Sequence, residues 1–311
     1  MKILICGTGS IAYRHYCNLL KLGYKKIIFY KSTKKKIYFN QISKNKIFYK
    51  LDLALKENPD VVFICNVTSA HIKIAIECAK NKKNIFLEKP LSNNISQLKL
   101  FKKLVIKNKV KVFVGYMMRF HPLIQAIKKM IDSNKLKNIF YVNSVWGEYL
   151  PNWHKYEDYK KSYAAKKKLG GGAALTLSHE IDLMSFLFGK IKNYTLKKQF
   201  SSSLKINTDV SASYLIRFTN DIDCNINVNF LSNPPYRKLV IFSENLQLFF
   251  DYYKSTLKII NSNNKIKIIK IKNFNRNDLF IKELKYFFKK LKKRNSYMNL
   301  NDSIRLMKYI S

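Results

Sequence analysis

A lysine that follows the short apolar run Ile85–Leu87 is well placed for chemistry. Lys89 stands between Glu88 and Pro90, directly after that run. An ammonium group at the end of a buried strand can polarise an oxygen or assist a proton transfer. The proline restricts the backbone and makes a cis peptide accessible, which would aim the lysine side chain. Taken alone, the tripeptide is better explained by a surface salt bridge before a helix.

A histidine in the middle of the chain is the second candidate. Three glycines, Gly170–Gly172, precede a helical stretch that contains His179 and, three residues on, Asp182. Residues at this spacing share one helix face, so the carboxylate can orient the imidazole and stabilise its protonated form. Such a histidine can act as general base for an alcohol proton. A lone histidine on a helix is more often structural, and its coincidence with the lysine and a glycine turn favours catalysis.

The glycine turn lies at the start of the chain, between an apolar run and an amphipathic helical pattern. The pattern Gly-x-Gly-x-x-Ala follows Lys2–Cys6. Its glycines let backbone and pyrophosphate approach closely, and the helix N-terminus offers unpaired N–H groups. A tight turn without a ligand is the alternative. We expect a dinucleotide to bind this turn, whose residues are Gly7, Thr8, Gly9, Ser10, Ile11 and Ala12.

The second expected strand, Lys26–Tyr30, ends without an acidic residue. NAD-binding domains of this type carry Asp or Glu about 20 residues after the glycine turn, where it holds the ribose hydroxyls. Here the first acidic residue of the chain is Asp52, and Lys31, Ser32 and Thr33 follow the strand. An ammonium group and two hydroxyls can bind a ribose 2′-phosphate, which a carboxylate would repel. We therefore expect NADP(H) to be preferred over NAD(H), unless compositional drift removed the acid without changing the cofactor.

Strands alternate with helices over about the first 115 residues. The expected strands are Lys2–Cys6, Lys26–Tyr30, Asp60–Cys65, Asn84–Leu87 and Val110–Gly115. This alternation predicts a doubly wound parallel sheet, in which ligands bind at the carboxyl ends of the strands. The glycine turn and Lys89 would both lie at that edge.

From about residue 120 the pattern changes to neighbouring strands that suit an open, mostly antiparallel sheet, followed by two helices. The predicted fold class is α/β, with an N-terminal Rossmann domain and a C-terminal α+β domain. We expect the dinucleotide-binding domain to span residues 1–119. We expect residues 120–311 to form the substrate-binding and oligomerisation domain.

Taken together, these features resemble the glucose–fructose oxidoreductase and inositol 2-dehydrogenase family, Gfo/Idh/MocA, over nearly the whole chain. The matching segments are the glycine turn, residues 65–71, 88–90 and 115–122, and the stretch from Gly170 to His179. The resemblance implies that Lys89 and His179 are the catalytic pair. It implies that Asn66, Thr68, His71 and Glu88, together with Lys89, surround the nicotinamide half of the cofactor. Arg119 and His121 would lie near the substrate.

Thr176 and Leu175 occupy positions where family members usually carry an Asp, three or four residues before the histidine. Either Asp182 and Lys89 suffice for catalysis, or the activity is altered or lost.

The aromatic segment from Trp146 to Tyr163 is similar to the substrate-covering region of members associated with surface-sugar biosynthesis. Flat rings stack on the C–H face of a sugar, and the polar groups between them can bind its hydroxyls. An aromatic loop that packs on the second sheet is the alternative. Expected substrate contacts are Arg119, His121, Trp153, His154, Tyr163, Thr176 and His179.

The formal net charge of +40 would attract polyanions such as nucleic acid. Lysines are spread over the whole length and accompany many Ile, Asn, Tyr and Phe residues, all with AT-rich codons. We therefore interpret the charge mainly as compositional bias, with a selected attraction to anions as the alternative. The five cysteines are an odd number without C-x-x-C spacing, so we expect neither disulfides nor zinc. No apolar run reaches the roughly 20 residues that cross a bilayer, and we expect a cytoplasmic protein.

The predicted activity is hydride transfer between a nicotinamide cofactor and a secondary alcohol or ketone of a sugar, sugar nucleotide or cyclitol, with surface-glycan biosynthesis as a candidate pathway. We expect no metal, no specific nucleic acid and no membrane partner, and the resemblance implies a homo-dimer or homo-tetramer. Two other readings stay open. One is a catalytically silent dinucleotide sensor or partner-binding protein, which the Thr176 departure supports. The other is a nucleic-acid binder, which only the charge supports.

Overall fold

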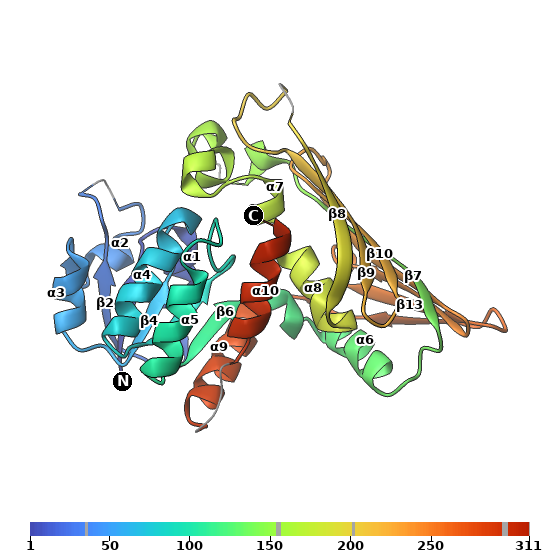
Figure 1. The fold of residues 1–311 in the computed structure, drawn as a ribbon, viewed down its shortest axis with the longest axis horizontal. Helices are drawn as coiled ribbons and strands as arrows, with labels where there is room; N and C mark the ends of the chain where they lie inside the picture. Colours follow the sequence, from blue (N-terminus) through green and yellow to red (C-terminus); the bar gives the residue numbers. More distant parts are fainter. Residues whose placement is uncertain (35–36, 154–156, 201–202, 294–297, 311) are drawn as a thin grey trace. The chain divides into compact units, whose positions relative to one another are not determined.

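The structure is a computed structural model of residues 1–311, drawn in Figure 1. It describes all residues except 35–36, 154–156, 201–202, 294–297 and 311. The chain forms two compact units. The first comprises residues 1–115 and 280–309, and the second comprises residues 116–279. Each unit is described by itself.

A six-stranded sheet forms the centre of the first unit, and its paired strands are all parallel. The strand order β3-β2-β1-β4-β5-β6 is that of a Rossmann fold. The strands are β1 (Lys2–Cys6), β2 (Lys26–Tyr30), β3 (Ile47–Phe48), β4 (Val61–Ile64), β5 (Asn84–Glu88) and β6 (Val112–Gly115). The two central strands are buried on both faces, which explains their continuous apolar sequence.

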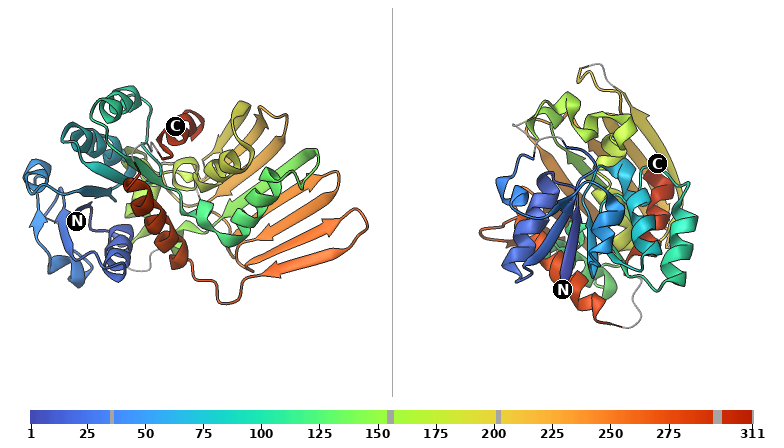
Figure 2. Two further views of the ribbon diagram at one scale, coloured as in Figure 1. Left: turned by 90° about the horizontal axis from the view of Figure 1, so that it is seen from below. Right: turned by 90° about the vertical axis from the view of Figure 1, so that its left-hand side faces the viewer.

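Helices cover both faces of this sheet (Figure 2). They are α1 (Ser10–Lys21), α2 (Asn40–Ser43), α3 (Leu51–Lys56), α4 (Thr68–Lys80) and α5 (Leu98–Lys107). The register pairs Cys6 of β1 with Tyr30 of β2 and Ile64 of β4. The carboxyl ends of these strands therefore lie side by side, and the loops that follow them share one edge of the sheet.

The last two helices, α9 (Asn277–Leu291) and α10 (Leu300–Ile310), differ from the predicted division of the chain. Most of their residues cluster with the first sheet, whereas the sequence placed residues 120–311 in one domain. Phe287 of α9 packs with its ring centroid 5.3 Å from that of Phe86. The buried Asn299 side chain accepts a hydrogen bond from the Val114 N–H (2.9 Å) and donates one to the Val114 carbonyl (2.7 Å). Helix α9 thus adds to the core of the first sheet, and Asn299, directly before α10, binds its edge strand β6.

The second unit contains an eight-stranded sheet with the order β14-β13-β12-β11-β7-β10-β9-β8. Neighbouring strands in this sheet run antiparallel, except for β7 and β10, which are parallel. The strands are β7 (Ile139–Gly147), β8 (Ile191–Gln199), β9 (Ser211–Phe218), β10 (Asp223–Asn229), β11 (Tyr236–Ser243), β12 (Leu246–Asp251), β13 (Thr256–Asn261) and β14 (Ile266–Lys270). The predicted α/β fold class, with a parallel and a mostly antiparallel sheet, is confirmed.

Helices α7 (Ala173–Thr176) and α8 (His179–Phe188) pack on β7, β9 and β10 of the second sheet. The other helices of this unit are η1 (Met117–Phe120), α6 (Pro122–Asp132), η2 (Leu150–Asn152), η3 (Tyr159–Lys161), η4 (Tyr163–Ala165) and η5 (Lys167–Leu169). Burial alternates along β9, and Leu215 on its outer face is 63% exposed. The sheet is therefore open on that face, as its alternating sequence predicted.

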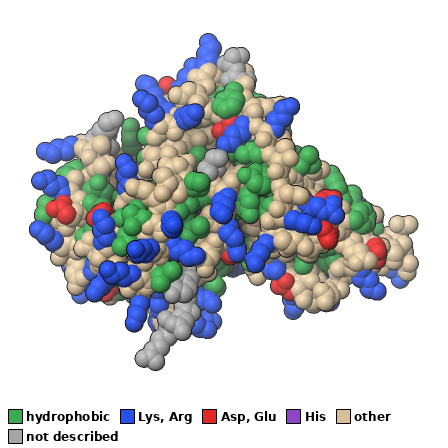
Figure 3. Space-filling view, in the orientation of Figure 1, with side chains coloured by type: hydrophobic (Ala, Val, Ile, Leu, Met, Phe, Trp, Pro, Cys, Tyr) green, Lys and Arg blue, Asp and Glu red, His purple; other side chains and the backbone are tan. Residues whose placement is uncertain are grey.

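Lysine and arginine side chains are spread over the face that Figure 3 displays and do not gather on one element. Within the described ranges, no helix has both the length and the apolar character needed to span a membrane.

Candidate active site

The glycine turn joins β1 to α1 at the carboxyl edge of the parallel sheet. Gly7 has a φ of +110°, and a Cβ at this position would lie 2.7 Å from the Cys65 carbonyl oxygen. Only glycine allows this approach between the turn and the end of β4. The Gly7 N–H also donates to the Tyr30 carbonyl (2.8 Å), so the turn is held against strands on both sides.

Gly9, in contrast to Gly7, has open space where a side chain would be. A Cβ built on Gly9 would meet nothing within 4 Å, and the residue is exposed. No side chain caps the start of α1, and its first turn contains no acidic residue. The first N–H groups of this 12-residue helix are therefore left without a side-chain cap or a competing carboxylate. Residues Gly7 to Ala12 thus fit the pyrophosphate of a dinucleotide.

The loop after β2 carries the three residues expected at the ribose. Lys31 is buried, and desolvation lowers the pKa of its ammonium group. Ser32 and Thr33 are exposed. All three follow the strand beside β1, so they share the sheet edge with the glycine turn.

Strand β5 ends at Glu88, directly before the half-buried Lys89. The Glu88 carboxylate is buried and lies 2.6 Å from His15 Nε2, which comes from α1. The Lys89–Pro90 peptide is cis. The sequence did not single out His15, and its only indication was a polar residue on the sheet-facing side of the predicted helix.

His71 and Asn66 lie beside the same tripeptide. His71 Nδ1 is 2.8 Å from the Pro90 carbonyl oxygen, and its Nε2 is 2.9 Å from the Asn66 carbonyl oxygen. Burial lowers the pKa of His71, which is 1% exposed. Thr68, at the start of α4, is also buried. The first unit therefore gathers all the residues expected on the nicotinamide side.

In the second unit, His179 begins α8 and is buried between two aromatic rings. The Tyr116 ring meets it edge-on at 5.7 Å between centroids, and the Trp146 ring lies at the same distance. The imidazole therefore packs against both rings.

The residue after this histidine ties α8 to the sheet. Glu180 accepts hydrogen bonds from Arg237 Nε (2.8 Å) and Nη2 (2.5 Å), and both side chains are buried. The Arg237 guanidinium lies 4.1 Å from the centroid of the Trp146 ring. One buried cation thus holds both the helix and the indole against which His179 packs, and sequence reasoning missed it.

Asp182 accepts two hydrogen bonds from Arg119, at 2.8 Å from Nε and 2.6 Å from Nη2. The carboxylate is 1% exposed, and the guanidinium lies over the Phe186 ring at 5.2 Å. The structure therefore brings together an expected catalytic residue and an expected substrate residue as a bidentate pair. The support of His179 by Asp182 stays a prediction.

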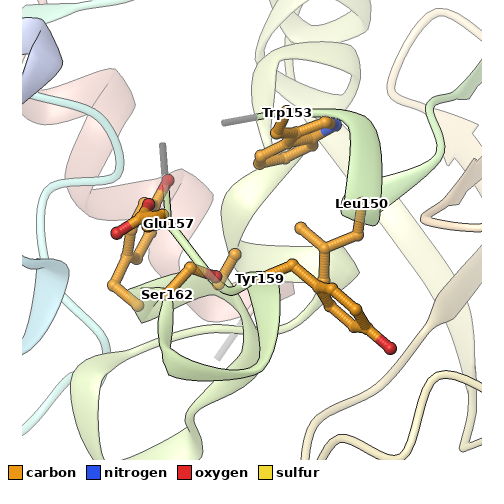
Figure 4. A pocket seen from close by; sticks show the side chains of 7 residues that line it. Leu150, Trp153, Glu157, Tyr159 and Ser162 are labelled. Carbon is orange, nitrogen blue, oxygen red and sulfur yellow. The ribbon is translucent and has the colours of Figure 1, made fainter. Parts of the chain in front are cut away.

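The remaining expected substrate residues have varied surroundings. His121 is buried, and its Nδ1 accepts the Leu123 N–H at 3.2 Å, so it caps α6. Thr176 is buried at the end of α7. Trp153 and Tyr163 line one small pocket, shown in Figure 4, together with Leu150, Glu157, Tyr159, Ser162 and Ala164. His154 lies outside the described residues.

Family models match both parts of the chain. The model described as "Oxidoreductase family, NAD-binding Rossmann fold" matches residues 1–116, and the GFO/IDH/MocA C-terminal domain matches residues 124–249. The chain belongs to the GFO/IDH/MocA oxidoreductase family. The resemblance read from the sequence is confirmed.

Individual GFO/IDH/MocA relatives are distant in sequence. The chain is 26% identical over 203 residues to Oxidoreductase P35 of Formosa agariphila, covering 64% of this chain and 62% of that protein. It is 31% identical over 147 residues to the scyllo-inositol 2-dehydrogenase (NAD(+)) of Bacillus subtilis, covering 45% and 43%. A solved structure of levoglucosan dehydrogenase in complex with NADH and levoglucosan has a TM-score of 0.86 at 15% identity, covering 100% of this chain and 96% of that one. The structural likeness establishes the fold alone.

The buried pair of this GFO/IDH/MocA chain should matter for stability. Arg119→Met would leave the Asp182 carboxylate buried without its guanidinium, so the free energy of unfolding should fall by about 3 kcal/mol or more. Lys128→Met removes a surface pair with Asp132 in the same unit and should cost about 0.5 kcal/mol or less. Urea unfolding of both variants measures the difference. Equal effects would contradict a structural Arg119–Asp182 pair.

Proposed function

We propose that the protein is a nicotinamide-dependent oxidoreductase that acts on a secondary alcohol or ketone of a sugar, sugar nucleotide or cyclitol. The open glycine turn at the start of α1, in a sheet with Rossmann strand order, carries the proposal. Family membership supports it. The relative named scyllo-inositol 2-dehydrogenase and the structure that holds levoglucosan support a polyhydroxylated substrate.

The bound nicotinamide supplies the hydride acceptor or donor. In this proposal the Lys89 ammonium polarises the reacting oxygen, while His179 takes or gives the hydroxyl proton. Asp182 supports His179 on the shared helix face. Lys89 belongs to the first unit and His179 to the second, so the proposal requires both to reach the same substrate oxygen.

The proposal also covers how the sugar is held, where the protein acts and how it assembles. Trp153 and Tyr163 would stack on the sugar from the small pocket that they line. The protein would act in the cytoplasm, in surface-glycan biosynthesis, as a homo-dimer or homo-tetramer. Self-association would use the open face of the second sheet, where Leu215 is exposed.

One observation favours a second candidate, a catalytically silent dinucleotide sensor. Thr176 is buried at the end of α7, in place of the Asp that family members usually carry. Without that carboxylate, proton transfer at His179 would depend on Asp182, which Arg119 already engages.

A substrate panel separates the two candidates. The purified protein would be incubated with NADP⁺ or NAD⁺ and inositols, levoglucosan, free hexoses or UDP-sugars, while nicotinamide absorbance is followed. Turnover of any panel member supports the oxidoreductase. Tight cofactor binding without turnover across the panel supports the sensor and contradicts the proposed activity.

We propose that NADPH binds more tightly than NADH, because residues 1–51 contain no carboxylate to hold the ribose hydroxyls. Lys31→Asp should reverse this preference, whereas Lys44→Asp, the same charge change at an exposed lysine, should leave it unchanged. Titration followed by nicotinamide fluorescence measures the four affinities needed for each comparison. Equal or tighter binding of NADH by the unmodified protein would contradict the preference.

Lys89→Ala should lower turnover by about 100-fold or more, the scale of losing one positioned charge-stabilising group. NADPH affinity should be nearly unchanged, because the pyrophosphate would lie on the Gly7 to Ala12 turn. His179→Ala should have a similar effect. The double variant should lose less than the product of both, since the two groups would act on one oxygen.

Lys99→Ala, at an exposed position of α5, is the matched control for the lysine and should leave turnover unchanged. If Lys89→Ala abolished NADPH binding or unfolded the protein, the catalytic assignment would be withdrawn.

A further inference from the structure

We propose that two buried histidines, His15 and His71, are positioning residues for Lys89, because they hold the residues directly before and after it. We call the contacts of His15 with Glu88 and of His71 with Pro90 the brace. Its importance for turnover rests on the proposed function of Lys89. The brace itself concerns only the geometry of the first unit and can be tested without a substrate.

The first half of the brace is the contact between His15 and Glu88. His15 is 0% exposed, and its Nε2 lies 2.6 Å from Glu88 Oε1. A carboxylate only accepts hydrogen bonds, so the Nε2 proton is donated to Glu88. The imidazole packs against Phe86, with 5.0 Å between ring centroids, in an environment that water does not reach. Losing the donor would leave a buried carboxylate without its partner, which is costly.

This contact joins two parts of the expected active site. His15 lies in α1, the helix that the glycine turn opens, and Glu88 ends the strand that carries Lys89. The position of the lysine is therefore tied to the helix whose N-terminus would hold the pyrophosphate.

The second half of the brace comes from α4. His71 Nδ1 lies 2.8 Å from the Pro90 carbonyl oxygen, and Nε2 lies 2.9 Å from the Asn66 carbonyl oxygen. Both oxygens only accept, and the imidazole, which is 1% exposed and whose pKa burial lowers, carries one N–H in its neutral form. In the brace this proton lies on Nδ1 and is donated to the Pro90 carbonyl. Both ring nitrogens thus face backbone carbonyls, so His71 holds the segments that carry Asn66 and Pro90.

Lys89 therefore lies between two anchored neighbours. The Glu88 side chain is fixed to α1, and the Pro90 carbonyl is fixed to α4. With both flanking residues held, the backbone cannot turn the lysine away without breaking one of the two contacts. Such support from surrounding side chains is what keeps a reacting group within the narrow range of productive positions.

Amide substitutions can separate the brace from general stability. The glutamine amide nitrogen can replace histidine Nε2, and the asparagine amide nitrogen can replace Nδ1. At position 15, where Nε2 makes the contact, His15→Gln should preserve the brace and His15→Asn should break it. At position 71, where Nδ1 holds Pro90, the order reverses: His71→Asn should preserve the brace and His71→Gln should break it.

Chemical labelling reports the position of the lysine directly. The full-length variants would be exposed briefly to acetic anhydride, and peptide mass spectrometry would give the labelling rate of Lys89 relative to the exposed Lys99. His15→Asn and His71→Gln should raise this ratio about fivefold, the scale of one net hydrogen bond. His15→Gln and His71→Asn should leave it near the value of the unmodified protein.

A control variant reports what destabilisation alone does. Asn299→Ser removes hydrogen bonds to Val114 elsewhere in the first unit and should lower the melting temperature without changing the labelling ratio. The brace would be overturned if the Lys89/Lys99 labelling ratio rose in step with the loss of melting temperature across all five variants, or if it changed in none of them.

Turnover then separates the brace from the proposed function. With a substrate from the panel, both brace-breaking variants should lower kcat, and His15→Asn should leave the cofactor KM nearly unchanged. If the labelling ratio rises only in His15→Asn and His71→Gln while Lys89→Ala keeps full turnover, the brace is upheld and the catalytic role of the lysine is overturned. If Lys89→Ala loses turnover but the labelling ratio does not separate the two pairs of histidine variants, the catalytic role is upheld and the brace is overturned.

Discussion

The close approach of the glycine turn to the end of β4 determines how the first unit is arranged. Gly7 lies so near the Cys65 carbonyl that a Cβ would come within 2.7 Å of the oxygen. This contact sets where α1 leaves the sheet, and α1 in turn carries His15 to Glu88. The glycine turn, helix α1 and Lys89 are thus linked by one series of buried contacts. Displacing one of these members would displace the next.

Much of the first sheet could be predicted because its central strands are buried on both faces and appear as apolar runs. Residues 61–64 are all buried, and a glycine turn and a Glu-Lys-Pro tripeptide mark two strand ends. The position of α9 and α10 could not be predicted. Their contacts, such as Asn299 with Val114, join residues 185 positions apart, and local patterns carry no information about such pairs.

The second unit shows the same limit at individual side chains. Helical spacing correctly put His179 and Asp182 on one helix, which the structure begins at His179. It could not reveal that the Asp182 carboxylate accepts two hydrogen bonds from Arg119, 63 residues away, or that Arg237 binds Glu180. Spacing tells which residues share a helix face, while the partner of a buried charge depends on which other elements pack there.

The central claim is that a dinucleotide lies on the glycine turn, and Gly9→Ala tests it most directly. Gly9 has an extended backbone with φ of −81°, and a methyl group there would meet no protein atom within 4 Å. The melting temperature should therefore stay unchanged, while the added methyl blocks the approach of the pyrophosphate. Titration with NADPH should show affinity at least about tenfold weaker, a loss of about 1.4 kcal/mol. Unchanged affinity in a fully folded variant would contradict the account.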